Sequence, residues 1–175
     1  MRPLIAMMFL LLSLAVPVRG QADAALETSV RVGLDASDRD TAFTLYDVGG
    51  RMRFEPWWRW GDGWSLGMSL VGSTGLLDDR VHTGLIVGLG PRLELRFPPS
   101  GWMLYIGSRA SLLSRNKFTD VDLGGVFIFS NDLGIQYLLK DRFFLEYAFQ
   151  HSSNARIYRR NPGVDFHVLT VGWRF

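Results

Sequence analysis

Apolar residues recur at every second position along most of this 175-residue chain. The pattern is clearest at the end, where Leu169, Val171, Trp173 and Phe175 alternate with small or polar residues. A period of two places successive side chains on opposite faces of a β-strand. No segment after the N-terminus offers a long apolar helix, so the alternation predicts an all-β protein.

About eight runs of this kind follow one another, and turn signals separate them. They cover residues 30–34, 43–54, 64–71, 86–97, 102–112, 121–139, 142–150 and 165–175. The clearest breaks are the polar turn at Asp78-Asp79-Arg80 and the tight turn at Pro98-Pro99-Ser100-Gly101. A soluble sandwich or a lipocalin-like barrel has similar spacing, so the runs alone leave the environment open.

The character of the two strand faces favours a membrane barrel over a soluble one. One face carries large apolar residues, and the other carries Gly, Ser, Thr, Arg, Glu and Gln. Lipid is the outer solvent of a membrane barrel, so its apolar side chains point outward and its interior is polar. Aromatic residues at strand ends fit the girdles of such barrels: Trp57, Trp58, Trp60, Trp102, Trp173 and Phe175.

The N-terminus reads as a targeting segment. Arg2 supplies a positive start, residues 4–16 are apolar, and Pro17 interrupts the run. Val18 and Gly20 then offer small side chains at the −3 and −1 positions of a cut. A membrane anchor would need a longer run of roughly 20 residues. We therefore expect a cleaved signal peptide over residues 1–20 and an outer-membrane β-barrel over residues 21–175, with a cut near residues 22–24 as the alternative.

The alternating C-terminal segment ends on Phe175, which resembles the signal that outer-membrane barrels present to their assembly machinery. Together with the signal peptide, this predicts an eight-stranded antiparallel transmembrane β-barrel. Only closure pairs every backbone group in lipid. Eight strands leave an interior that side chains fill, so we expect a hydrogen-bonded polar plug and no porin function.

Composition excludes several other classes. The formal net charge is only +2 and the Arg residues are scattered, so we expect no nucleic-acid partner. The chain has no Cys, which removes disulfides and thiolate metal sites. A metal site built from His82, His151 and His167 lacks any recognisable ligand spacing, so no metal is expected.

The position of polar residues on the last two strands points to a hydrolytic site. On the strand that ends at Ser153, the odd positions form the lipid face, and they include His151 and Ser153 but not Ser152. Asp165 lies on the same face of the final strand. A His that deprotonates a Ser, and a carboxylate that orients the His, form a nucleophilic triad. A short His-x-Ser also occurs by chance, so ordinary rim residues remain the alternative.

The residues around this site resemble the lipid A 3-O-deacylase family, the PagL-like outer-membrane hydrolases. The match is His-x-Ser-Asn-Ala over residues 151–155, then Asn-Pro-Gly over residues 161–163 and the strand over residues 165–175. The resemblance implies an esterase that removes the 3-hydroxyacyl chain from the 3 position of lipid A without a cofactor. Its substrate would be lipid A or whole lipopolysaccharide.

The resemblance also implies roles for individual residues. Ser153 would be the nucleophile, His151 the base and Asp165 the acid, at a position where family members have Glu. The backbone N–H groups of Ala155 and Arg156 would form the oxyanion hole, although a Gly is familiar at the second position. Asn161 would hold the loop, and Asn154 would be structural near the site.

Strand direction places this site at the extracellular rim, facing the outer leaflet, if the N-terminus is periplasmic. Arg156, Arg159 and Arg160 share the adjacent loop, where they either bind lipid A phosphates or remain solvated. The main alternative function is a non-catalytic structural or adhesion barrel, and acyl transfer between lipids is a third. A homodimer is compatible with each of them, but the sequence does not determine the oligomeric state.

Overall fold

The computed structural model describes residues 26–175 except 38, 98 and 99, and it is built from antiparallel strands. The expected signal peptide lies outside these described residues. The strands are β1 (Leu26–Asp35), β2 (Thr44–Arg53), β3 (Trp58–Trp60), β4 (Trp64–Asp78), β5 (Thr83–Phe97), β6 (Trp102–Leu113), β7 (Phe127–Leu139), β8 (Phe143–Ser153) and β9 (Val164–Arg174). No helix of the described part is long and apolar enough to cross a membrane.

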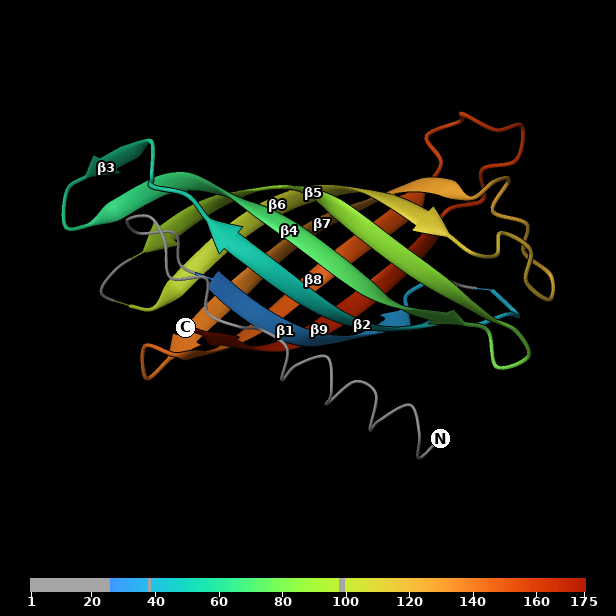
Figure 1. Ribbon diagram of the computed structural model, residues 1–175, viewed down its shortest axis with the longest axis horizontal. Helices are drawn as coiled ribbons and strands as arrows, with labels where there is room; N and C mark the ends of the chain where they lie inside the picture. The colour runs from blue at the N-terminus through green and yellow to red at the C-terminus, as the bar shows by residue number, and fades with distance from the viewer. Residues whose placement is uncertain (1–25, 38, 98–99) are drawn as a thin grey trace.

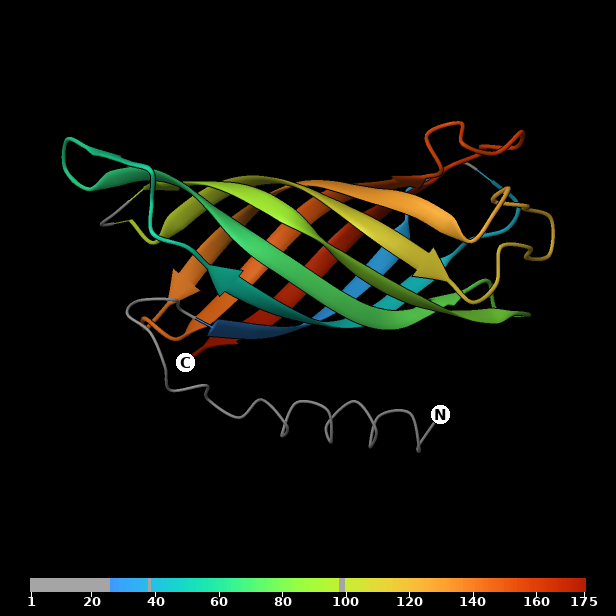
Figure 2. The ribbon, with the colours of Figure 1, turned by 45° about the horizontal axis from the view of Figure 1, so that its top comes forward.

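Eight of these strands close into a barrel, which confirms the expected fold. The sheet order is β2-β1-β9-β8-β7-β6-β5-β4-β3, and an additional β2–β4 pairing closes the ring. Each of the eight barrel strands therefore has a hydrogen-bonded neighbour on both sides, as a lipid environment requires. Figures 1 and 2 show the tilted strands, with the β8–β9 loop at the opposite end of the barrel from the C-terminus.

The short strand β3 lies outside the barrel wall and was not expected from the sequence. It pairs with the first residues of β4, Trp58 with Leu66 and Trp60 with Trp64. Gly61 and Gly63 have positive φ angles in the turn between them, a conformation that Gly adopts without steric cost. The Trp cluster therefore forms a projecting hairpin at the end of the barrel that also holds the C-terminus (Figure 1).

The connection between β6 and β7 is longer than the sequence pattern indicated. The expected strand from Val121 begins instead at Phe127, and residues 114–126 form a loop with one isolated bridge between Lys117 and Asp122. Asp122 accepts hydrogen bonds from the Asn116 side chain and from Gly124 N–H. These local bonds compete with strand pairing and keep the segment in a loop.

The barrel wall separates apolar from polar residues in the way that the alternation predicted. On β8 the odd positions from Phe143 to His151 are exposed, and the even positions are buried. Inside, Glu146 accepts two hydrogen bonds from Arg92 and one from Arg51. The expected hydrogen-bonded plug is confirmed.

The interior changes character toward the end that holds the β8–β9 loop. There it is filled by an apolar cluster that includes Phe43, Leu45, Leu77, Val164 and Phe166. Val164 and Phe166 are almost fully buried and flank Asp165 in the sequence. Their packing fixes the start of β9, so the intervening side chain of Asp165 points away from the interior.

Candidate active site

The β8–β9 hairpin brings His151 and Asp165 together on the outer surface of the barrel. The two residues are direct partners in the antiparallel register. The imidazole Nδ1 of His151 lies 2.6 Å from Oδ1 of Asp165. Both side chains are partly exposed, at 47% and 33%. A carboxylate can only accept, so Nδ1–H of His151 donates to Asp165. The other ring nitrogen, Nε2, is then the one available to take a proton from a nucleophile.

The structure separates the two adjacent serines of β8. Ser153 is partly exposed and shares the outer face with His151, two residues away. Ser152 points inward, where its hydroxyl donates to Ser130 Oγ and accepts from the side-chain amide of Gln150. Among the hydrogen bonds between described residues, none joins Ser153 Oγ to His151. The outer face therefore holds His151 and Asp165 in contact, with Ser153 on the same face.

The β1–β2 loop holds the backbone of Asp165, a contact that the alternating pattern does not predict. Ala36 N–H donates to the Asp165 carbonyl at 2.8 Å, and Asp165 N–H donates to Ser37 Oγ at 3.3 Å. The carboxylate of Asp35 in turn accepts from the N–H groups of Ser37 and Phe43, which orders this loop. Hydrogen bonds to the β1–β2 loop thus hold both the backbone N–H and the carbonyl of Asp165.

Asn154 anchors the loop that follows Ser153. Its side chain is fully buried, and Nδ2 donates to the carbonyls of Leu123 at 2.7 Å and Arg160 at 2.6 Å. Its backbone N–H donates to Oδ1 of Asn161 at 2.9 Å. The two asparagines therefore tie the start of the loop to its end, and Leu123 ties it to the β6–β7 loop.

The next two residues turn the chain in a left-handed conformation. Ala155 and Arg156 have φ angles of 51° and 66°. Ile157 N–H donates to the Asn154 carbonyl at 2.9 Å and closes the turn. Non-glycine residues occupy this region at a cost of about 1–2 kcal/mol each. The turn begins one residue after Ser153, and consecutive N–H groups in a turn of this kind can bind an oxyanion.

Gly163 forms one wall of the site, although the sequence indicated no role for it beyond the matching motif. Its φ angle is 63°. A Cβ added there would lie 2.9 Å from Cε1 and 3.6 Å from Nε2 of His151. Any side chain at this position would therefore press on the imidazole next to its free nitrogen.

The three arginines of the loop lie at its exposed surface. Arg156, Arg159 and Arg160 are all exposed, and Nη1 of Arg160 lies 3.4 Å from Oδ2 of Asp122. Beside them a cavity of about 540 Å³ is lined by Arg39, Arg160, Asp120 and Asp122, among others. Within the described part of the chain, no group of three or more His, Asp or Glu side chains is placed to hold a metal ion.

Comparisons with known proteins identify the family of the chain and agree with its fold. The family described as "Lipid A 3-O-deacylase (PagL)" matches residues 45–174, which include the whole β8–β9 hairpin. The protein named "Lipid A deacylase PagL" from Bordetella bronchiseptica (strain ATCC BAA-588 / NCTC 13252 / RB50) is 33% identical over 78 residues. That alignment covers 43% of this chain and 44% of the relative, so the chain matches less than half the length of the relative.

Solved structures show the same fold at lower sequence identity. The crystal structure of the outer membrane enzyme PagL superposes with a TM-score of 0.72 at 17% identity, over 83% of this chain and 97% of that one. The N-terminal β-barrel domain of Pseudomonas aeruginosa OprF gives a TM-score of 0.61 at 17% identity, over 89% and 100%. Because the family match spans most of the chain, the protein belongs to the lipid A 3-O-deacylase (PagL) family.

Proposed function

We propose that this protein is an outer-membrane esterase that removes the 3-hydroxyacyl chain from the 3 position of lipid A. The observation that carries the proposal is the 2.6 Å pair of His151 and Asp165 on the outer barrel face, with Ser153 beside it. A His and an Asp on a surface that meets lipid lower the stability of a barrel, so their presence there favours a functional role. The family name supports an ester of lipid A as the substrate.

The reaction follows from the roles that these side chains can take. His151 Nε2 removes the proton of Ser153 Oγ, which attacks the carbonyl carbon of the ester. Asp165 holds the imidazole through Nδ1 and stabilises its positive charge. The oxyanion of the tetrahedral intermediate is bound by the N–H groups of Ala155 and Arg156.

The intermediate then collapses, and His151 returns the proton to the sugar oxygen that leaves. Water, deprotonated by His151, next attacks the acyl group on Ser153 and releases a free 3-hydroxy fatty acid. Each step needs only groups of the protein, the ester and one water molecule. As the resemblance implies, the mechanism requires no metal or other cofactor.

We further propose that the site faces the outer leaflet, where lipopolysaccharide lies. The site lies at the opposite end of the barrel from the start of β1 and the C-terminus (Figure 1). If the end that holds the C-terminus is periplasmic, the β8–β9 loop is extracellular. Arg156 and Arg159 then project at the level of anionic sugar and phosphate groups, and their planar guanidinium groups suit bidentate binding of phosphate. All the site residues come from one chain, so a single barrel or a homodimer is equally compatible with activity.

The test is the mass spectrum of lipid A from cells that express the protein. Wild type should produce lipid A that lacks one 3-hydroxyacyl chain, whereas Ser153→Ala and His151→Ala should leave lipid A intact. Ser152→Ala is the matched control, because Ser152 faces the interior, and it should deacylate normally. All four barrels should show the heat-dependent gel mobility of a folded barrel.

The same spectra distinguish the alternatives. An acyltransferase would add mass to lipid A, and a structural or adhesion barrel would leave it unchanged in every strain. Loss of the ester with both wild type and Ser153→Ala would rule out Ser153 as the nucleophile.

A further inference from the structure

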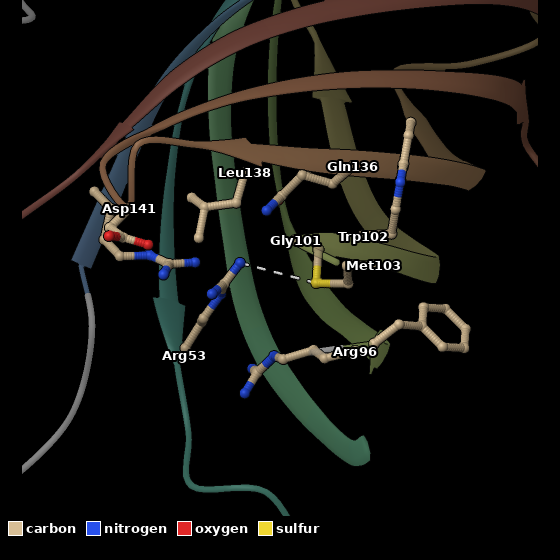
Figure 3. Close-up of a pocket in the computed structure, with 10 residues that line it drawn as sticks. Arg53, Arg96, Gly101, Trp102, Met103, Gln136, Leu138 and Asp141 are labelled. Atoms are coloured by element: carbon tan, nitrogen blue, oxygen red, sulfur yellow. Dashed lines mark hydrogen bonds between the residues drawn. The ribbon is translucent and has the colours of Figure 1, made fainter. Parts of the chain in front are cut away.

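The end of the barrel opposite the candidate active site contains a second pocket that the proposed reaction does not use. It has a volume of about 390 Å³ and opens at the ends of β2, β5, β6, β7 and β9. Its wall combines three arginines with apolar side chains: Arg53, Arg96, Arg174, Trp102, Met103 and Leu138. Figure 3 shows the Arg53 guanidinium directed across the pocket toward the Met103 sulfur, with Arg96 nearby.

The arginines around this pocket outnumber the carboxylates that they contact. Glu27 pairs with Arg51, Arg53 and Arg174, and Glu94 pairs with Arg51, Arg53 and Arg96. Both glutamates are fully buried. Two carboxylates are thus shared by four guanidinium groups. Arg51 also pairs with Glu146, and a further carboxylate, that of Asp141, lines the mouth of the pocket.

Arg53 is the least satisfied member of this group. Its side chain is 9% exposed, and its Nε lies 3.5 Å from Oε2 of Glu94 without forming a hydrogen bond to any described residue. Nη2 reaches Glu27 at 3.1 Å and the Met103 sulfur, a weak acceptor, at 3.8 Å. Both carboxylates near Arg53 are shared with other arginines, so a bound anion would add the acceptors that this buried guanidinium lacks.

The other two arginines keep donors free at the mouth. Arg96 uses Nε and Nη2 to bind one oxygen of Glu94, and Arg174 uses Nε to bind Glu27. Within the part of the chain that the structure describes, Nη1 of Arg96 and both Nη atoms of Arg174 donate no hydrogen bond. Guanidinium donors from three strands, β2, β5 and β9, can surround a phosphate, which has more oxygens than the two of a carboxylate.

We propose that this pocket is a phosphate-binding site at the end of the barrel that holds the C-terminus. The phosphate is either inorganic phosphate or part of a lipid headgroup, because both present the same cluster of anionic oxygens to the arginines. Its ligand adds acceptors for Arg53, Arg96 and Arg174 and so stabilises the folded barrel. The inference does not depend on deacylase activity.

The experiment measures thermal unfolding of the purified barrel in phosphate-free maltoside micelles. Inorganic phosphate is titrated at constant ionic strength, and circular dichroism and Trp fluorescence report unfolding. A parallel series adds phosphatidylglycerol, with diacylglycerol as the lipid that lacks phosphate. Wild type should show a saturable rise of the melting temperature, because a ligand that binds only the folded state stabilises it.

Arg96→Gln should weaken the apparent affinity for phosphate by about tenfold, the size expected for losing one charge-assisted hydrogen bond. Arg59→Gln is the matched control, because Arg59 lies at the same end but is 66% exposed and pairs only with Glu55 among the described residues. If Arg96→Gln does not fold, Arg174→Gln replaces it.

A response to inorganic phosphate identifies the free anion as a ligand, and a response only to phosphatidylglycerol identifies the headgroup. The proposal is overturned if neither probe shifts the melting temperature. Arg59→Gln should respond like wild type, and the proposal is also overturned if Arg96→Gln does so too.

Discussion

His151 and Asp165 face each other directly across the β8–β9 pair, and 2.6 Å separates the imidazole Nδ1 from the carboxylate Oδ1. Side chains at directly opposed positions start only about 4.5–5.5 Å apart at Cβ. This register explains how an Asp, one methylene shorter than the Glu expected from the family resemblance, reaches the ring. Direct pairing of the two residues brings the Asp165 carboxylate within hydrogen-bond distance of the His151 ring.

The carboxylate of Asp165 should be required for rate rather than for folding. In Asp165→Asn the amide no longer selects the tautomer with its proton on Nδ1, so the fall in kcat should be about 10³–10⁴-fold, as in related triads. The measurement is the release of 3-hydroxy fatty acid from purified lipopolysaccharide. The variant should remain a heat-modifiable barrel, and undiminished kcat would remove Asp165 from the mechanism.

The fold was predictable because the alternation can be read from the sequence, and closure follows from the need to pair every backbone group in lipid. The inward or outward position of each residue on β8 follows from parity alone, and exposure matches it from Phe143 to His151. The β3 hairpin and the start of β7 were not predictable in this way. Both depend on local turns, at Gly61 and at Asp122, which override the apolar pattern nearby.

The site was predictable only in part, because some of its contacts come from distant segments. His151, Ser153 and Asp165 share one face by parity, and the sequence indicates that directly. Ser37 is 128 residues from Asp165, and the hydrogen bond between them depends on barrel closure, which brings β1 beside β9. The closeness of Gly163 to the His151 ring depends on the shape of the loop, which alternation does not describe.

Gly163 should be needed to keep the imidazole in place. In Gly163→Ala, the new Cβ would lie 2.9 Å from His151 Cε1, so the ring must move away. A misplaced base costs up to about 100-fold in rate. We therefore expect a large fall in kcat with little change in KM, measured on lipopolysaccharide in micelles.

Gly61→Ala is the control that distinguishes displacement of the His151 ring from backbone strain alone. Gly61 also has a positive φ angle of 55°, but it lies in the β3–β4 turn at the far end, and an added Cβ would meet nothing within 4 Å. Gly61→Ala should therefore lose some stability and keep full activity. Equal activity in both variants would contradict a positioning role for Gly163.

Arg156 should be a source of strain that glycine relieves. Its φ angle of 66° costs about 1–2 kcal/mol in a non-glycine residue, and Gly adopts this conformation freely. Glycine also has more entropy to lose on folding, so the net gain should be about 1 kcal/mol. Arg156→Gly should raise the free energy of unfolding in urea by this amount. Arg159→Gly, at a position without a positive φ, should instead lower it slightly.

Asp79 links two loops at the same end of the barrel as the candidate site. It lies between β4 and β5, outside the strands, and its carboxylate accepts hydrogen bonds from the N–H and hydroxyl groups of Thr119 in the β6–β7 loop. Burial raises the pKa of Asp79, but bonds from the N–H groups of Thr119 and His82 and from the Thr119 hydroxyl lower it by more. The folded-state pKa therefore lies well below the usual value of about 4.

Because folding depresses this pKa, Asp79 stabilises the protein at any pH above its unfolded-state value. That contribution begins to fall as the pH drops toward 4, where Asp79 is protonated in the unfolded chain, and it is fully lost only below the depressed folded-state pKa. The difference in unfolding free energy between wild type and Asp79→Asn should be constant from pH 8 to about 5.5 and shrink toward pH 3. Asp62→Asn, in the exposed β3–β4 turn, serves as the control for removing one carboxylate from a loop. A difference for Asp79→Asn that stays constant down to pH 3 would contradict the depressed pKa.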